Sequence, residues 1–200
     1  MNIVINDYDG RDSYYEERHG NYIIWLGTNG NKTTNKMHEL AHINMGTDID
    51  EACEHIAMWI LKANFTPEIR KSKHDLILES FHQVWNILED ERVESFSPRL
   101  FKKHKRVMGQ RKTKEDVMNN PVEALLCARF DRNDLIDFHV KGFIKNVRLG
   151  SKEKVYKIAE MYCKYYIIPW IKENPNIYYG RESIEMNINK KPRYYSYGKI

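Results

Sequence analysis

Two histidines and a glutamate stand at the spacing of a hydrolytic metal site, in the sequence His38-Glu39-Leu40-Ala41-His42. Residues four apart lie on one face of a helix, so His38 and His42 can each offer a ring nitrogen to the same metal ion. Glu39 lies about 100° round the same helix, where it can take a proton from a metal-bound water. This HExxH pattern is typical of zinc hydrolases, in which imidazoles hold Zn2+, the ion acidifies water and a carboxylate acts as general base.

A catalytic zinc ion usually takes three protein ligands, so a third must come from elsewhere in the chain. The best candidate is Glu89, which flanks the apolar face of a predicted helix in the stretch NILEDERVE. A partly buried carboxylate there needs a metal ion or an arginine as its partner. Arg92 projects onto the same face, so an ordinary Glu89–Arg92 ion pair is the competing interpretation. Asp90 is an alternative ligand. Glu94 is placed to orient a ligand without contacting the metal itself.

Asp48 is a further alternative, because it follows His42 by six residues. That spacing requires a glycine three residues after the second histidine, where this chain has Met45, so a helix cap explains Asp48 better. A distant histidine is the remaining option. The one that fits best is His82, one helical turn before Asn86 on the side of Glu89. The histidines that we considered are His55, His74, His82, His104 and His139.

The chain resembles metallopeptidase-like proteins of phages and the peptidase-like part of cobalt-chelatase-type proteins linked to von Willebrand A domains. The resemblance rests on HELAH, on Thr47-Asp48 shortly after it and on NILEDERVE, and covers about residues 22–96. It implies a zincin-like fold of the gluzincin type. In that fold His38 and His42 bind zinc, Glu39 is the base, and one acid of the Glu89-Asp90 pair is the third ligand.

The sequence departs from that family in two places. Ala41 stands where many zincins have glycine. The more familiar gluzincin pattern spaces its two acids as E-x-x-x-D, whereas Glu89 has Val93 at that offset and Asp90 has Glu94. The choice between Glu89 and Asp90 therefore stays open at the level of sequence.

The elements that would position these residues are mainly helical, with a small strand region ahead of the motif, which gives an α+β fold class. Ile3–Ile5 and Tyr22–Leu26 predict strands, and the second is a natural edge for an extended peptide. The motif helix is expected from about Thr34 to Met45, after the capping residues 33–35. Further helices are predicted at 51–64, at 69–96 as one helix or two, and at 122–130, 135–147 and 152–172.

Composition indicates one globular domain over residues 1–175 and a basic, tyrosine-rich tail or strand extension over 176–200. Apolar residues make up 42% and charged residues 30% of the chain, and no apolar run is long enough to span a bilayer. Cys53, Cys127 and Cys163 form no CxxC pair, and we expect no signal peptide. These features predict a reducing, cytoplasmic location, in the host cytoplasm if the chain is phage-encoded.

Taken together, the sequence predicts a zinc-dependent peptidase with one Zn2+ per chain, a peptide or protein substrate and no membrane partner. Residues 99–114 carry eight Lys or Arg and no acid. This run favours an alternative, a nucleic-acid-binding protein, and the basic residues Lys190–Arg193 with their nearby tyrosines point the same way. A solvated charged surface explains the run more simply. A catalytically inactive zincin-fold binding module is the third interpretation.

Overall fold

The computed structural model describes residues 2–10, 13–27, 31–110, 113–118, 120–132 and 134–174. The protein is mainly helical with a small three-stranded sheet near the N-terminus, which confirms the predicted balance of elements. Its contacts divide the chain into two compact units, one containing Met1–Asn44 and the other comprising Met45–Tyr178. The residues predicted as a tail, 176–200, lie outside the described residues, as do residues 28–30 ahead of the motif.

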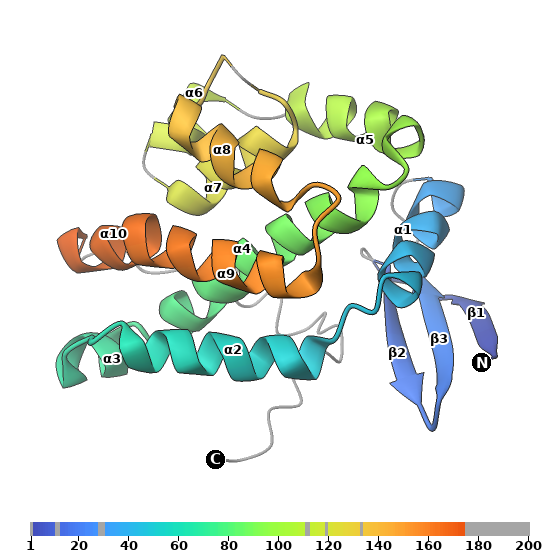
Figure 1. Ribbon diagram of the computed structural model, residues 1–200, viewed down its shortest axis with the longest axis horizontal. Helices are drawn as coiled ribbons and strands as arrows, with labels where there is room; N and C mark the ends of the chain where they lie inside the picture. The colour runs from blue at the N-terminus through green and yellow to red at the C-terminus, as the bar shows by residue number, and fades with distance from the viewer. Residues whose placement is uncertain are drawn as a thin grey trace. The chain divides into compact units, whose positions relative to one another are not determined.

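The sheet of the first unit contains β1 (Ile3–Asp7), β2 (Tyr14–Arg18) and β3 (Asn21–Leu26) in the order β1-β3-β2 (Figure 1). β1 runs parallel to β3, and β2 runs antiparallel to it. The two predicted strands are β1 and β3, whereas β2 was not predicted. Because β3 has a partner on each side, the prediction that it offers an open edge to a peptide is wrong. The edges of the described sheet are β1 and β2.

The motif helix, α1 (Lys32–Asn44), packs against this sheet. Leu40 and Ile43 contact a core that includes Tyr15, Ile24 and Leu26, as the apolar back of the helix predicts. The helix begins two residues earlier than expected. The reason is Asn31, whose side-chain oxygen accepts the backbone N–H groups of residues 33 and 34 and caps the first turn.

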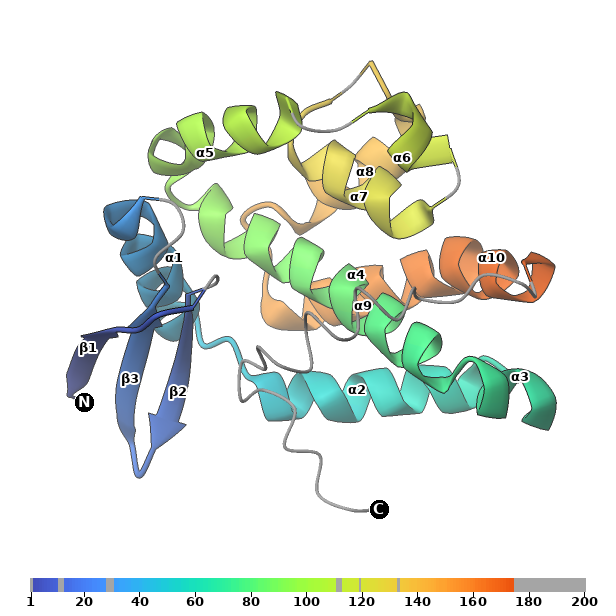
Figure 2. The same ribbon diagram turned by 180° about the vertical axis from the view of Figure 1, so that it is seen from behind.

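The second unit is built round α4 (His74–Ser95), which is drawn in green at its centre in Figure 2. It packs against α2 (Ile49–Lys62), α3 (Pro67–Ser72), α5 (Pro98–Gln110), α7 (Pro121–Arg129), α8 (Phe138–Val147) and α9 (Lys152–Tyr162). A short helix, α6 (Lys114–Met118), packs on α7. Phe81, Val84 and Leu88 are almost fully buried on α4. The predicted segment 69–96 is therefore two helices, which separate at Lys73.

Two prolines account for the main differences from the predicted helices. Pro98 begins α5 rather than merely ending the helix before it, since proline is well suited to a first helical turn. The predicted helix over 152–172 is α9, a π-helical turn at Cys163–Ile167 and α10 (Ile168–Glu173). Pro169 has no N–H to donate, and the N–H of Ile168 reaches back five residues to the carbonyl of Cys163. No helix in the described part of the chain has the length and apolar character needed to cross a membrane.

Gly46 terminates the motif helix in a left-handed conformation, with φ of +66°. A side chain is strained there, so Gly46→Ala should lower the free energy of unfolding by about 1–2 kcal/mol. Gly142 is the matched control, because it lies within α8 and an added methyl group would meet nothing. Gly142→Ala should raise stability by about 0.5–1 kcal/mol. Urea denaturation followed by circular dichroism measures both; equal effects of the two substitutions would contradict the assignment.

Candidate functional site

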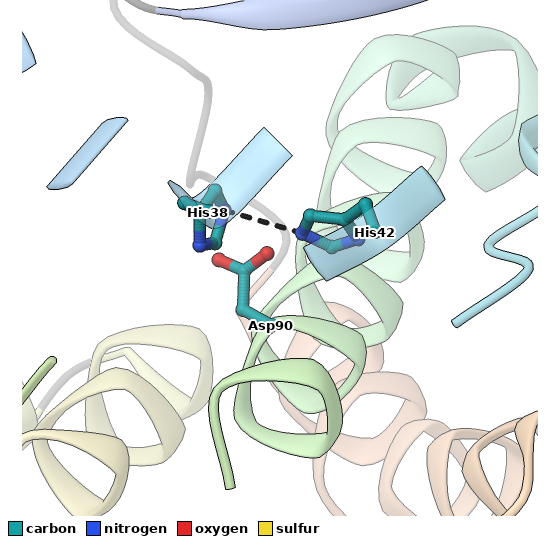
Figure 3. Close-up of side chains that lie close together, drawn as sticks. All are labelled: His38, His42 and Asp90. Carbon is teal, nitrogen blue, oxygen red and sulfur yellow. Dashed lines mark hydrogen bonds between the residues drawn. The ribbon is translucent and has the colours of Figure 1, made fainter. Parts of the chain in front are cut away.

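His38 and His42 face each other along one side of α1. Their Nε2 atoms are 3.2 Å apart, and the rings meet edge to face (Figure 3). Two nitrogens bound to one tetrahedral zinc ion at about 2.0–2.1 Å lie about 3.3 Å from each other. The observed separation therefore suits a shared ion. The same contact is also a hydrogen bond if one of the two nitrogens carries a proton and the other does not.

Other residues of the first unit hold this pair in place. The ring of Tyr15, from β2, stacks on the ring of His42 with centroids 6.4 Å apart. Tyr15 lies opposite Ile24 in the sheet, so the support of His42 comes from the core itself. Glu39 is buried, with 6% of its surface exposed. An ionised carboxylate at that depth is costly unless a cation or hydrogen-bond donors accompany it.

The acidic stretch of α4 is buried all the way round the helix, from Ile87 to Glu94. It contains four carboxylates, and four basic side chains in the second unit contact them. The acids are Glu89, Asp90, Glu91 and Glu94, and the bases are Arg92, Lys105, Arg129 and Arg148. Only Arg92 was expected from the sequence. The number of buried acids requires several cations, but nothing in the sequence says which distant residues supply them.

Glu89 is held by Arg92 and Thr47. The Nε and Nη2 atoms of Arg92 donate to the two oxygens of Glu89 at 2.7 and 2.5 Å, and the Thr47 hydroxyl donates to one of them. Arg92 also donates to the backbone carbonyl of Met45 at 3.1 Å. Glu89 and Arg92 therefore form the intrahelical ion pair that the sequence offered as the competing interpretation. Together Glu89 and Arg92 fix the segment that leads into α2.

Asp90 has a different set of neighbours. Arg129 lies between Asp90 and Glu94, with nitrogen–oxygen distances of 3.0 and 2.9 Å. An ionised carboxylate has about four acceptor positions, so the contact of Arg129 with Oδ2 of Asp90 is compatible with a metal ion at the other oxygen. Glu94 contacts Arg129 and Lys105. The predicted role of Glu94 in supporting a ligand stays a prediction.

Burial alone lowers the pKa of the Arg129 guanidinium, but the charges of Asp90, Glu94 and Glu91 outweigh it and raise the pKa above its ordinary value. Arg129 therefore remains charged, and it keeps Asp90 and Glu94 compensated.

The remaining candidates for a third ligand have other structural roles. Asp48 caps α2, because its side chain accepts the backbone N–H of Glu51 at 3.0 Å. His55 stacks on Tyr156, His74 pairs with the adjacent Asp75, and His82 meets the ring of Trp85. His104 and His139 are exposed. None of these five histidines belongs to a group of three metal-binding side chains in the described part of the chain.

Comparisons with protein families, with curated proteins and with solved structures found nothing that matches this chain. The resemblance to phage metallopeptidases and the zincin-like fold accordingly stay predictions.

The Glu89–Arg92 pair gives a direct test of charge compensation in α4. Arg92→Met leaves a buried carboxylate without its cation, and we expect a loss of about 3–5 kcal/mol in the free energy of unfolding. The double variant Glu89→Gln/Arg92→Met removes both charges and should recover at least half of that loss. Urea denaturation of the two variants measures the difference. If the double variant is as unstable as Arg92→Met alone, the pair does not act as described.

The pKa of His82 gives a second test. Burial lowers the pKa of this histidine to about 4, whereas an unfolded chain has a histidine pKa of about 6.5. Between these values the unfolded chain binds more protons, so stability falls as the pH drops through this window. His82→Phe should lose less stability between pH 7 and pH 5 than the unsubstituted protein. His74→Gln, at an exposed position, is the control and should leave the pH dependence unchanged.

Proposed function

We propose that this protein is a zinc-dependent peptidase of zincin-like fold, with His38, His42 and Asp90 as metal ligands and Glu39 as general base. The observation that carries the proposal is the 3.2 Å separation of the two Nε2 atoms on α1. A buried glutamate lies next to the first of these histidines in the same helix. Two imidazoles and a carboxylate form a donor set that zinc takes in hydrolases.

We choose Asp90 rather than Glu89 as the third ligand because the two acids have different hydrogen-bond and ion-pair partners. Both oxygens of Glu89 accept hydrogen bonds from Arg92, and a metal ion there would have to displace a buried guanidinium. Asp90 meets Arg129 through Oδ2, and Arg129 also has Glu94 as a partner. Figure 3 draws the three proposed ligands, each of which can offer one ligand atom.

The roles of the chain's own residues follow from ordinary zinc hydrolase chemistry. A zinc ion held by these ligands would supply Lewis acidity and lower the pKa of a water molecule from its value in bulk water to about 7. Glu39 would accept the proton of the attacking water and pass it to the amine that leaves the cleaved peptide. Tyr15 would keep the ring of His42 in position. An extended substrate would pair with β1 or β2, the edges of the described sheet.

Metal content tests the ligand set. The purified protein should contain close to one zinc ion per chain by elemental analysis. Asp90→Asn keeps an acceptor for Arg129 but should weaken zinc binding by at least about 100-fold, as should His42→Ala. Glu89→Gln/Arg92→Met removes the neighbouring acid together with its cation and should retain the metal. If this double variant loses zinc while Asp90→Asn keeps it, Glu89 is the ligand and our assignment is wrong.

Turnover tests the base. Glu39→Gln should retain zinc and lower the hydrolysis of a mixture of internally quenched peptides by at least about 100-fold. Glu54→Gln, an exposed glutamate on α2, is the matched control and should keep full activity. Full activity in Glu39→Gln would exclude the mechanism. Zinc binding without hydrolysis of any peptide in the unsubstituted protein would favour the inactive binding module instead.

A further inference from the structure

The second unit contains a pocket of about 650 Å³ between α5, the end of α4 and the turns that follow α7 and α8. It contains none of the residues of the proposed peptidase site. Its size is that of a pocket for a small organic ligand. Pro98, Phe130 and Leu149 give it apolar surface. Five basic side chains line it as well, against two acidic ones, Glu91 and Asp131. The bases are Lys102, Lys105, Arg106, Arg132 and Arg148.

Three of these cations are fixed by acids that lie beside or beneath the pocket. Glu91 is 1% exposed, and it accepts from Lys105 at 2.5 Å and from Arg148 at 2.6 Å. Arg132 makes two bonds to Asp134 and donates to the carbonyl of Gly109 at 2.7 Å. The ion pairs therefore hold these three cations in place before any ligand binds, and the acids balance most of their charge.

The other two cations, Lys102 and Arg106, are exposed and lie one turn apart on the pocket face of α5. No ion pair among the described residues involves either of them. Two adjacent cations without a carboxylate partner fit one phosphate group, whose oxygens can be reached from both sides. Gly109 holds α5 at this distance, because a methyl group there would come within 3.0 Å of the Phe130 carbonyl.

The backbone at the pocket rim is strained. Leu149 and Asp131 both have left-handed φ angles, of 53° and 56°, and Leu149 keeps 67% of its surface exposed. An exposed leucine in this conformation costs free energy and gains little from burial. Strain of this kind gathers at binding sites, where the side chain serves the ligand. Here the exposed Leu149 side chain adds apolar surface to a pocket that is also lined by cations.

We propose that this pocket binds a nucleotide, with its phosphate on Lys102 and Arg106 and its base against Leu149 and Phe130. The base would have to be unstacked to enter, so the ligand is either a free nucleotide or an exposed nucleotide of a single strand, and not a duplex. Three cations of the basic run 99–114 would then belong to a ligand site, because Lys102, Lys105 and Arg106 line the pocket. Residues 111 and 112 of that run lie outside the described residues.

The test uses the full chain and a fluorescent single-stranded DNA of about 12 nucleotides, with affinity measured by anisotropy between about 50 and 200 mM salt. Lys102→Gln/Arg106→Gln should weaken binding by at least about tenfold and reduce the salt dependence by about one phosphate contact. Arg99→Gln/Lys103→Gln removes the same charge from exposed positions of α5 outside the pocket. It should cost less than about threefold.

A third variant separates binding from folding. Leu149→Gly relieves the left-handed strain, so it should raise the urea midpoint of unfolding while it weakens DNA binding by about fivefold.

Competition then identifies the source of the ligand. Displacement of the strand by AMP at micromolar concentration points to a free nucleotide, and displacement only by single strands points to nucleic acid. The proposal is overturned if Lys102→Gln/Arg106→Gln and Arg99→Gln/Lys103→Gln lose equal affinity for the single strand. It is also overturned if a duplex binds more tightly than the single strand, or if polyglutamate competes as well as a single strand does. Absence of binding at low salt would overturn it too.

Discussion

The fold of the second unit depends on the compensation of buried charge along α4. A helix whose residues 87–94 are all buried, and which carries four carboxylates there, can exist only if cations are brought to it. Arg92 comes from the helix itself, Lys105 from α5, Arg129 from the end of α7 and Arg148 from the turn after α8. The ion pairs of Lys105, Arg129 and Arg148 each link a neighbouring segment to α4. We infer that these charges help to specify which segments pack against α4, and that loss of one partner would leave a costly buried charge.

The same ion pairs determine what the surrounding side chains are able to do. Glu89 and Arg92 hold the backbone between Met45 and Thr47. Glu91 sets the positions of Lys105 and Arg148 on the wall of the basic pocket. Arg129 contacts both Asp90 and Glu94, so one guanidinium serves two acids. The four acids share their cations in part, because Lys105 likewise contacts both Glu91 and Glu94.

Much of this arrangement could be predicted from local patterns, and the rest could not. The HExxH spacing gives the facing histidines, and the apolar residues Leu40 and Ile43 give the packed back of α1. Strand β2 could not be recognised, because YYEER alternates poorly and gains its stability from pairing with β3. The basic run in α5 was treated as a charged segment, because its helical form depends on burying Phe101 and placing Gly109 against Phe130.

The choice between Glu89 and Asp90 illustrates this limit most clearly. Adjacent residues on a helix point about 100° apart, so one of them must face a different neighbour from the other. Sequence spacing predicts Arg92 as a partner of Glu89, because residues three apart on a helix are neighbours. The partner of Asp90 is Arg129, 39 positions later, and its identity depends on how α7 packs against α4. Sequence spacing therefore predicts how residues that share a helix turn lie relative to one another, whereas the tertiary structure is needed wherever neighbouring acids compete for cations.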